Sequence, residues 1–478
     1  MPGRDFGPAP APTHKEEAVD LKITNGTIVT SSDVYRADLG IKDGRIVSLA
    51  KKIKEEAAET INAQGLYILP GGVDVHTHLD MPFGGTISAD DFESGTIAAA
   101  CGGTTSLVDF AIQSKGGSLR SALETWSKKA AGKAVIDYGF HVAVTDLNEA
   151  VMAEIPELVA AGITSFKCFL AYKGALMIDD GALFKVFKAA RKCGALVMLH
   201  AENGDVIDVL IQEALANGQT APIFHALTRP PELEGEATGR GIRIALMAQA
   251  PVYIVHLSCW EALAEVKAAR DEGWPVYAET CPQYLLLSQR NYLERGFNGA
   301  KYVMSPPLRG KDNWDVLWTG LAAGDLQVVS TDHCPFNFKG QKDMGKHSFA
   351  AIPNGAPGIE HRLMLLYHAG VNKKRLTLNR FVELVSTAPA KLFGLYPDKG
   401  AIAVGSDADL VLWDPRAAYV ITARKQHQRV DYTPYEGFKG KGLPKMVLSR
   451  GRVIVRDGRF EGRPGDGRFL KRRPFQPS

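Results

Sequence analysis

The chain has 478 residues, of which 45% are hydrophobic and 23% are charged, as in an ordinary globular protein. This composition excludes a chain that is disordered or coiled coil over its whole length. Lys plus Arg number 56 and Asp plus Glu number 53, so a formal net charge of +3 gives no support for binding nucleic acid or an anionic membrane through bulk charge. The basic end, Lys471-Arg472-Arg473, is expected to be a solvated tail.

The six cysteines form no CxxC pair and are too sparse for a disulfide framework. They predict reduced thiols and a cytoplasmic protein. The first twenty residues are rich in Pro and Ala but carry charges and lack the apolar run of a signal peptide. The uncharged stretch 245–260 holds Pro251 and His256 and is too short for a membrane helix. The sequence therefore predicts a soluble protein without a membrane segment.

The chain begins with a predicted flexible tail over residues 1–19, followed by short β segments within 20–70. The segments 21–29 and 38–50 contain Asn25-Gly26 and Asp43-Gly44, which are turn signals between β-forming residues. A third segment covers 60–69. This pattern predicts the first part of a small β domain.

The pattern changes at residue 71, where short apolar runs begin to alternate with amphipathic stretches of helical length. Such alternation predicts repeated β-α units around a parallel sheet. Helices are expected at 121–131, 182–193 and 260–272. Strands are expected at 73–76, 104–110, 138–144, 163–167, 195–200, 252–256, 275–280 and 326–332. Eight such units over 71–400 predict a (β/α)8 TIM-like barrel with insertions, since the usual length is ~250 residues.

The β pattern returns over residues 401–478. A turn at 405–409 precedes an apolar strand at 410–413, and 447–459 reads as a hairpin with a turn at Asp457-Gly458. The simplest assembly is an α/β protein whose barrel is flanked by a small β-sandwich domain built from both chain ends, with a C-terminal tail.

Residues able to bind a metal stand where the predicted barrel strands end. His76-Thr77-His78 ends the first strand, and side chains at i and i+2 of a strand point to the same face. A lone HxH is a weak signal, but four further apolar runs each end at such a residue: Lys167, His200, His256 and Asp332. At ~30 residues a unit, these groups fall on strands 1, 4, 5, 6 and 8, and the carboxyl ends of barrel strands share one mouth.

Four imidazoles and a carboxylate suit zinc, with manganese, cobalt or iron less favoured. A lysine among metal ligands is unusual, because an ammonium repels cations. A lysine whose pKa is lowered near cations is neutral, and it can then add carbon dioxide to form a carbamate with two oxygens. Such a carbamate can bridge two metal ions.

The motifs around these residues resemble one known family. The chain is similar from about residue 21 to 469 to the cyclic-amide branch of the amidohydrolase superfamily, and specifically to the dihydropyrimidinases (D-hydantoinases). The strongest pieces are GGVDVHTHLDMPF (71–83), ITSFKCFLAYKG (163–174), LHAENGD (199–205), YIVHLSC (253–259), STDHCPF (330–336), SDADLVLWDP (406–415) and DYTPYEGFKGKG (431–442).

This resemblance implies two Zn²⁺ ions per subunit. His76 and His78 would hold the first ion together with Asp332, and His200 and His256 would hold the second. Lys167 would bridge both ions as its carbamate (N6-carboxylysine), alongside a hydroxide. Asp332 would act as proton shuttle, taking the hydroxide proton and returning it to the leaving nitrogen.

The resemblance also implies a set of substrate contacts. Tyr172 would donate to the developing oxyanion, and Ser305 and Asn354 would bind the ring amide largely through their backbones. Candidates for the pocket around the ring's side group are Met81, Phe83 and Phe169. From the residues alone, Tyr172 also reads as a packing residue of the barrel rim, and Ser305 and Asn354 as turn residues.

Several polar residues near the predicted ligands are expected to have structural roles. Cys334 reads as a buried thiol, His333 as a packing or supporting residue, and His141 as a satisfied core histidine. Asp74 and Asp80 either orient the histidines or satisfy backbone donors.

The implied function is hydrolysis of a small cyclic amide to an N-carbamoyl amino acid. The implied substrates are dihydropyrimidines (5,6-dihydrouracil or dihydrothymine) or 5-substituted hydantoins. A homotetramer is also implied. Allantoinase and dihydroorotase remain alternatives, but residues 79–83 carry no cation to bind an anionic substrate. A scaffold relative that has lost its ligands is another alternative, and here all six ligand positions are filled.

Overall fold

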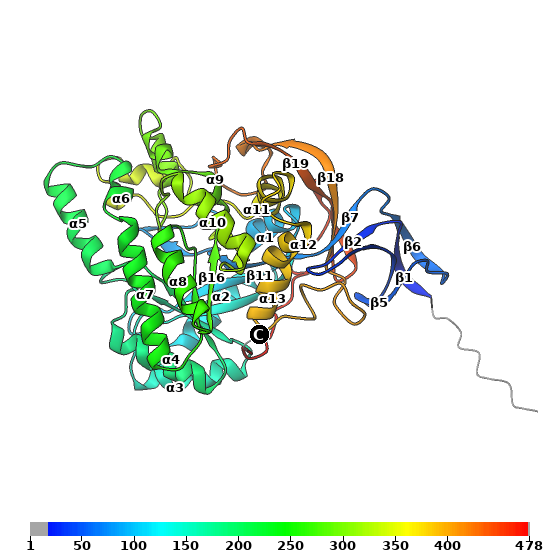
Figure 1. Ribbon diagram of the computed structural model, residues 1–478, viewed down its shortest axis with the longest axis horizontal. Coiled ribbons are helices and arrows are strands. Elements are labelled where there is room, and N and C mark those ends of the chain that lie inside the picture. Colours follow the sequence, from blue (N-terminus) through cyan, green and yellow to red (C-terminus); the bar gives the residue numbers. More distant parts are fainter. Residues whose placement is uncertain (1–17, 477–478) are drawn as a thin grey trace, which may run out of the picture.

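Eight parallel strands form the central sheet of the protein, and each pairs with its neighbours in chain order (Figure 1). The structure is a computed structural model and describes residues 18–476. The predicted tail over 1–19 lies almost wholly outside the described residues. The strands are β8 (Gly72–Thr77), β11 (Thr104–Ile112), β12 (Asp137–Ala143), β13 (Ser165–Phe169), β14 (Leu196–His200), β15 (Val252–Ile254), β16 (Val276–Thr280) and β17 (Val328–Val329). The first and last strands meet where the His78 amide donates to the His333 carbonyl oxygen at 2.9 Å. The barrel prediction is confirmed.

Two of these strands are shorter than predicted. Strand β15 ends at Ile254 and β17 at Val329, whereas the sequence pattern extends them to His256 and Asp332. The reason is local, because His256 and Asp332 have left-handed backbones, with φ of 38° and 53°. A non-glycine residue with positive φ cannot continue a strand. Both functional side chains therefore stand on turns just past the strand ends.

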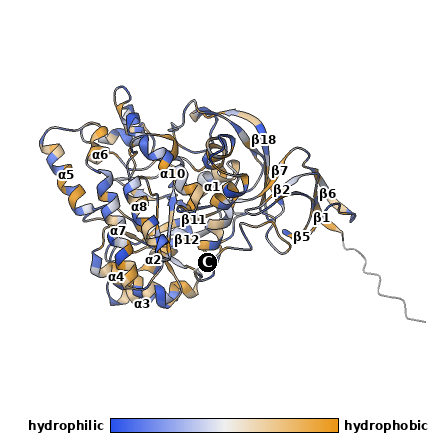
Figure 2. Ribbon diagram, in the orientation of Figure 1, coloured by the Kyte–Doolittle hydropathy of each residue, from blue (hydrophilic) through white to orange (hydrophobic). Residues whose placement is uncertain are grey.

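Helices follow the strands and cover the sheet (Figure 1). The helix α4 buries Leu183, Val186, Phe187 and Ala190, a spacing of three and four residues that gives one apolar face. Figure 2 shows such two-coloured helices around the barrel. The connection from β14 to β15 is longer than one helix because it contains α5 and α6 in addition to α7. The helices are α1 (Phe92–Cys101), α2 (Leu119–Ala130), α3 (Glu149–Ala160), α4 (Asp180–Lys192), α5 (Gly204–Ala216), α6 (Ile223–Leu227), α7 (Pro231–Met247), α8 (Trp260–Asp271), α9 (Pro282–Leu286), α10 (Asp312–Ala323), α11 (Arg362–Leu366), α12 (Leu378–Val382) and α13 (Ala388–Leu392).

Apart from Ile112 at the end of β11, all residues of the barrel strands are buried, as expected for a parallel sheet covered by helices. All five residues of β14, LVMLH, are buried. Leu196 and Met198 pack with Tyr253, Phe393 and Phe475 in one hydrophobic cluster. This tight packing gives the polar groups at the strand ends a rigid support.

Both chain ends contribute to a seven-stranded sheet, which lies beside the barrel next to a four-stranded N-terminal sheet (Figure 1). Residues from both sheets, including Ile23, Leu39, Ile68, Leu410 and Leu448, form one hydrophobic core. The larger sheet has the order β21 (Arg459–Phe460), β20 (Arg452–Arg456), β19 (Lys439–Ser449), β18 (Leu410–Val420), β7 (Tyr67–Pro70), β2 (Thr27–Val29) and β3 (Val34–Arg36); the smaller has the order β5 (Arg45–Ala50), β4 (Asp38–Lys42), β1 (Val19–Thr24) and β6 (Ala57–Asn62). This arrangement agrees with the predicted β-sandwich of both chain ends.

The two N-terminal turn signals have different outcomes. Asp43-Gly44 joins the paired strands β4 and β5, with φ of 50° and 77° at the two turn residues. Asn25-Gly26 joins β1 and β2, which belong to different sheets and do not pair with each other. Asn25 has a positive φ, and the turn connects the two sheets instead of forming a hairpin.

The basic C-terminal segment is not a solvated tail. Arg472 is buried and donates to the Phe140 carbonyl oxygen at 2.5 Å. The Arg472 and Phe475 amides donate to the carbonyl oxygens of Gly162 and Gly194. The chain end therefore packs along the barrel, and only Lys471 and Arg473 of the basic triplet are exposed.

Candidate active site

One cavity at the carboxyl ends of the barrel strands contains every residue that the sequence predicts for the site. Its lining includes the six predicted metal ligands and the three predicted substrate contacts: His76, His78, Lys167, His200, His256, Asp332, Tyr172, Ser305 and Asn354. Met81, Phe83, Phe169 and Cys334 also line it. The strand-end rule therefore brings together side chains that are far apart in the sequence, as expected for a barrel mouth.

His76, His78 and Asp332 form the first group of donors. The Nε2 atoms of His76 and His78 lie 3.1 and 3.2 Å from the same carboxylate oxygen, Oδ1 of Asp332. Within residues 18–476, these three make the one group of His, Cys, Asp or Glu whose ligand atoms all lie within 4.8 Å of one another. Burial alone would raise the pKa of Asp332, but His76 and His78 hold it well below its ordinary value.

A buried carboxylate that the sequence analysis did not single out holds His76 in place. Glu279, on β16, accepts from Nδ1 of His76, from the Tyr253 hydroxyl at 2.8 Å and from the Ser330 hydroxyl at 2.6 Å. A proton on Nδ1 leaves the lone pair of His76 on Nε2. That nitrogen is buried, and within the described residues it has no hydrogen-bond partner of acceptable geometry. Such a carboxylate–histidine pair is typical of metal ligands.

His200 and His256 form the second group. Nδ1 of His200 lies 2.9 Å from Nε2 of His256, and Nε2 of His200 lies 2.8 Å from Glu202. Because Glu202 fixes the proton on Nε2 of His200, the lone pair on Nδ1 faces His256. Burial lowers the pKa of His256 well below its ordinary value, which keeps its imidazole neutral and able to bind a metal.

Lys167, on β13, lines the same cavity as the two groups. Its ammonium nitrogen stands 4.8 Å from the ring centre of Phe110 and 5.1 Å from that of Phe169. Within the described part of the chain it makes no hydrogen bond. Burial lowers the pKa of Lys167 to about 8. An amine with such a pKa is partly neutral near neutral pH and can act as a nucleophile.

This donor set fits a metal centre. Buried polar groups normally find partners, yet Nε2 of His76 and Nδ1 of His78 and of His256 have none among residues 18–476. Glu279 and Glu202 hold a proton on one nitrogen of His76 and of His200, which leaves the other nitrogen of each ring with a free lone pair facing the neighbouring ligand residues. Neutral imidazoles and an ionised carboxylate are the forms that bind metals.

Tyr172 lines the same cavity, in a left-handed conformation with φ of 64°. Its ring centre lies 5.2 Å from that of His200. The polar side chains of Ser305 and Asn354 line the same cavity, and Asn354 donates to the Ser305 hydroxyl at 3.1 Å. Burial raises the pKa of Tyr172 above its ordinary value, so the phenol keeps its proton and can donate it in a hydrogen bond.

The main-chain groups of Ser305 and Asn354 are unused within the described residues. The carbonyl oxygens before and after Ser305 are both occupied, since His225 Nε2 lies 2.8 Å from the Met304 oxygen and the Tyr284 hydroxyl donates to the Pro306 oxygen at 2.8 Å. The Ser305 oxygen and the amide and carbonyl of Asn354 make no hydrogen bond with the described chain. A planar amide could pair with such a set of free donors and acceptors.

Aromatic and apolar side chains complete the lining of the cavity. Phe83, from the hairpin of β9 (Pro82–Phe83) and β10 (Thr86–Ile87), packs edge-on against Tyr172 with ring centres 5.5 Å apart. Phe169 lies 6.1 Å from the same ring. Leu176 adds an apolar wall that the sequence analysis did not single out.

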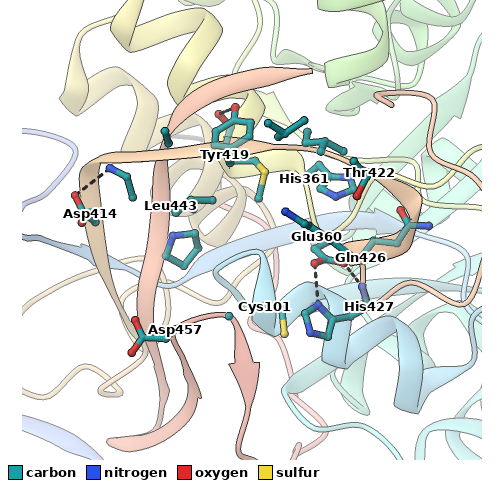
Figure 3. A pocket seen from close by; sticks show the side chains of 18 of the residues that line it. Cys101, Glu360, His361, Asp414, Tyr419, Thr422, Gln426, His427, Leu443 and Asp457 are labelled. Atoms are coloured by element: carbon teal, nitrogen blue, oxygen red, sulfur yellow. Dashed lines mark hydrogen bonds and ion pairs between the residues drawn. The ribbon is translucent and has the colours of Figure 1, made fainter. Parts of the chain in front are cut away.

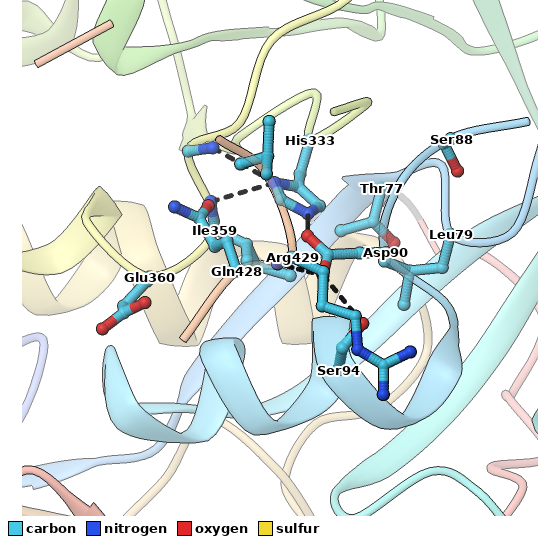
Figure 4. A network of polar contacts seen from close by, with 12 residues as sticks. Thr77, Leu79, Ser88, Asp90, Ser94, His333, Ile359, Glu360, Gln428 and Arg429 are labelled. Carbon is cyan, nitrogen blue, oxygen red and sulfur yellow. Dashed lines mark hydrogen bonds and ion pairs between the residues drawn. The ribbon is translucent and has the colours of Figure 1, made fainter. Parts of the chain in front are cut away.

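His333, next to Asp332, belongs to a buried network that fixes the turn (Figure 4). Nε2 of His333 lies 3.0 Å from Asp90, while Nδ1 accepts from the Gly358 amide at 3.1 Å. Asp90 also accepts from Ser94 and from the Arg429 amide. His333 is therefore a supporting residue, as predicted, and it helps to hold the left-handed backbone of Asp332.

The structural roles predicted for His141, Cys334 and Asp74 also agree with the structure. Both nitrogens of His141 have partners, the Ser165 hydroxyl and the Val75 carbonyl oxygen, so it is a satisfied core histidine. Burial raises the pKa of Cys334 well above its ordinary value, which keeps the thiol protonated. Asp74 accepts from the His76 amide and from Thr331. All six cysteines are free.

A second cavity, larger than the candidate active site, lies between the barrel and the paired strands β18 and β19 (Figure 3). On its wall the imidazole of His427 connects the Cys101 thiol to Glu360, whose carboxylate lies 2.8 Å from Nδ1 of His427. Burial raises the pKa of Cys101, and this residue ends α1, where the helix dipole disfavours a thiolate.

Comparison with known proteins agrees with this fold and site. The model of the amidohydrolase family matches residues 67–454, so the chain belongs to the amidohydrolase family. The model of the urease alpha-subunit N-terminal domain matches residues 4–69.

Within that family, named relatives resemble the chain over nearly its whole length. It is 55% identical to a D-hydantoinase of Geobacillus stearothermophilus, over 95% of this chain and 96% of that protein. It is 52% identical to a D-hydantoinase of Ralstonia pickettii, over 96% of this chain and 100% of that protein. The crystal structure of dihydropyrimidinase from Brevibacillus agri NCHU1002 superimposes with a TM-score of 0.95 at 54% identity, covering 95% of this chain and 99% of that one.

Within the described residues, no helix combines the length and the apolar composition that crossing a bilayer requires.

Proposed function

We propose that this chain is a binuclear metal-dependent hydrolase that opens the cyclic amide ring of 5,6-dihydropyrimidines, of 5-substituted hydantoins, or of both, giving N-carbamoyl amino acids. The observation that carries the proposal is the convergence of four imidazoles, Lys167 and Asp332 on one cavity that Tyr172, Ser305 and Asn354 also line. Relatives that match nearly the whole chain are named D-hydantoinase and dihydropyrimidinase, which supports this substrate class.

His76, His78 and Asp332 would hold one metal ion, and His200 and His256 the second. Lys167, as its carbamate, would supply an oxygen to each. When bound, two divalent ions lower the pKa of water and polarise the carbonyl of the ring. Zinc suits the nitrogen-rich donor set, with manganese, cobalt and iron as alternatives.

Asp332 would carry the proton during the reaction. Its carboxylate reaches into the cavity from a turn held by His333, and it lies within 3.2 Å of both histidines of the first group. In this role it takes a proton from the attacking water and returns it to the ring nitrogen as the amide bond breaks.

Tyr172 would donate its phenol hydrogen to the oxygen of the attacked carbonyl as that oxygen gains negative charge. A donor fixed in advance by burial and by two neighbouring side chains costs no reorganisation when the charge develops. The free main-chain groups of Ser305 and Asn354 would bind the N–H and C=O of the ring amide and so orient the scissile bond.

Met81, Phe83 and Phe169 would surround the substituent of the ring. The edge-on contact between Phe83 and Tyr172 makes this wall part of the same cavity. A 5-substituent of the ring would then lie against aromatic faces, with its size limited by the hairpin of β9 and β10.

The test is ring opening of dihydrouracil and of a 5-monosubstituted hydantoin in parallel, with protein supplied with zinc and bicarbonate. We expect turnover that a chelator abolishes, and the ratio of the two rates identifies the preferred ring. Turnover of only allantoin or dihydroorotate would contradict the substrate class. A protein that neither binds metal nor opens any ring would instead be a scaffold relative.

Three further expectations belong with this proposal. The catalytic barrel covers residues 71–400, and the β-sandwich domain covers 20–70 and, together with a C-terminal tail, 401–478. The protein is a homotetramer, which its mass in solution would test. It acts in the cytoplasm on a small molecule, without nucleic acid or membrane partners.

A further inference from the structure

Lys342 is a buried lysine that stands where two loops of the candidate active site meet. It begins a short 3-10 helix, η3 (Lys342–Gly345), and its exposed fraction is 0%. Its ammonium donates to the carbonyl oxygens of Val303, Pro353 and Gly355, each at 2.7 Å. An ammonium has three N–H bonds, so every donor of this side chain is used.

The three carbonyls belong to the two segments that carry the proposed amide-binding residues. Val303 lies two positions before Ser305, and Pro353 and Gly355 lie on either side of Asn354. The two segments also touch directly, because the Gly355 amide donates to the Val303 carbonyl oxygen at 3.0 Å. One cation therefore ties together two loops that follow different strands of the barrel.

This placement is costly for folding. No carboxylate faces the Lys342 ammonium within the described residues, and burial lowers its pKa to about 7. A buried charge without a counter-ion is unfavourable even when it is hydrogen-bonded. Lys399, another buried lysine of this barrel, has three carboxylates within 3.0 Å. Lys342 is thus poorly explained as a stabilising group.

We propose that Lys342 is a positioning residue for substrate binding, which fixes the Ser305 and Asn354 main chains at the spacing that a cyclic amide requires. The inference rests on the proposed function, because it assigns the ring amide to these two main chains. It adds a residue that does not touch the substrate and acts through the two loops.

The surroundings of Ser305 support this role. The carbonyl oxygens of Val303, Met304 and Pro306 are all held by side chains: Lys342, His225 and Tyr284. The Ser305 oxygen lies between them and has no partner within the described chain. A loop whose neighbouring carbonyls are fixed presents the remaining one in a defined direction, so a ligand need not order it.

The experiment compares Lys342→Met with Lys339→Met, an exposed lysine of the same loop. The measured quantities are metal content, KM and kcat for a ring that the wild-type protein opens. We expect unchanged metal content and a rise in KM of about tenfold or more, with a smaller change in kcat, because weakening the binding of substrate and transition state equally raises KM without changing kcat. Lys339→Met should match the wild type.

Amide hydrogen exchange gives a second readout that needs no activity. Exchange over residues 300–308 and 350–358 should be faster in Lys342→Met than in the wild type, while the barrel strands stay protected. If Lys342→Met does not fold, Lys342→Gln, which keeps two N–H donors, carries the same test.

A folded Lys342 variant with unchanged KM and unchanged exchange over both loops would overturn the inference. A wild-type protein that opens no cyclic amide ring would overturn the proposed function instead. The exchange measurement separates these failures, because it tests the hold of Lys342 on the loops without any substrate.

Discussion

The two ends of the barrel each contain a buried lysine among charged groups, and the two clusters are built in opposite ways. At the amino ends of the strands, Lys399 lies 2.7 Å from Asp137, 2.7 Å from Asp409 and 3.0 Å from Asp407. Burial lowers the pKa of Lys399, but these carboxylates raise it above its ordinary value. At the carboxyl ends, Lys167 has no hydrogen bond within the described residues, and its pKa is lowered to about 8.

The difference separates a structural cluster from a binding site. Around Lys399 the charges are paired, and Arg450 adds a further contact to Asp137. Around Lys167 one nitrogen each of His76, His78 and His256 lacks a hydrogen-bond partner among residues 18–476. Buried polar groups without partners cost about 1–3 kcal/mol each, so a cluster of them indicates a missing ligand. Burial alone therefore does not distinguish the two clusters, whereas several unpartnered nitrogens around one cavity do.

The largest effect on turnover should come from Asp332→Asn. The amide has the shape of the carboxylate but cannot accept the proton, so kcat should fall by about 10²–10⁴-fold. Steady-state ring opening at saturating zinc would measure this loss. Asp409→Asn at the opposite end is the matched control, and its kcat per folded molecule should equal that of the wild type. An Asp332→Asn protein with full metal content and wild-type turnover would remove the proton-shuttle role.

The next effect should come from Tyr172→Phe. Loss of one oxyanion donor lowers kcat by about 10²–10³-fold. The phenylalanine side chain should keep the position of the tyrosine ring, and metal binding should be unchanged. Tyr435→Phe, a fully buried tyrosine outside this cavity, controls for the loss of a hydroxyl. Equal rates for Tyr172→Phe and wild type would show that the phenol only packs against the rim.

Glu279→Gln should have a smaller effect, on metal affinity instead of turnover. Without the carboxylate, Nδ1 of His76 loses its strongest acceptor, so the affinity of the site should fall by about 10–100-fold. Competition with a chromophoric chelator would measure it, and excess zinc should restore activity. Glu360→Gln removes the same contact from His427, which is not a ligand, and should leave metal affinity unchanged.

Lys399→Met should change stability and leave turnover unaffected. Removing one partner of a buried ion cluster leaves carboxylates uncompensated and costs about 3–5 kcal/mol. Chemical unfolding would measure the loss, with kcat determined on the folded fraction. If Lys399→Met lowered kcat as strongly as Asp332→Asn, the two clusters would no longer differ in function.

The proposed metal ligands could be predicted from the sequence because strand ends are a local feature, whereas Tyr172, Ser305 and Asn354 followed only from the family resemblance. His76, His200 and Lys167 each close an apolar run, and the order of β-α units brings strand ends to one mouth. The carboxylates that support the histidines, Glu279 and Glu202, could not be predicted in this way. Glu279 reaches His76 across 203 positions, a pairing that no local pattern encodes.

The order of the barrel elements was predicted correctly, but the turns that end β15 and β17 were not, because these turns depend on contacts between distant residues. Hydrophobic period and length identified the barrel strands, but the left-handed backbones of His256 and Asp332 depend on contacts made elsewhere. One of these contacts is the pair of His333 and Asp90, 243 positions apart. An acidic residue near the end of an otherwise apolar strand, such as Glu279, is the signal that could have been used.

The central claim is that Lys167 and the histidines around it are metal ligands. The most direct test is the metal content per chain of the wild type and of Lys167→Ala, after supply of zinc and ¹³C-bicarbonate and removal of free metal. The account predicts two equivalents per wild-type chain with a carbamate ¹³C signal, and the loss of both the signal and at least one equivalent in Lys167→Ala. Equal metal content in the two proteins, or a wild-type chain that retains no metal, would contradict it.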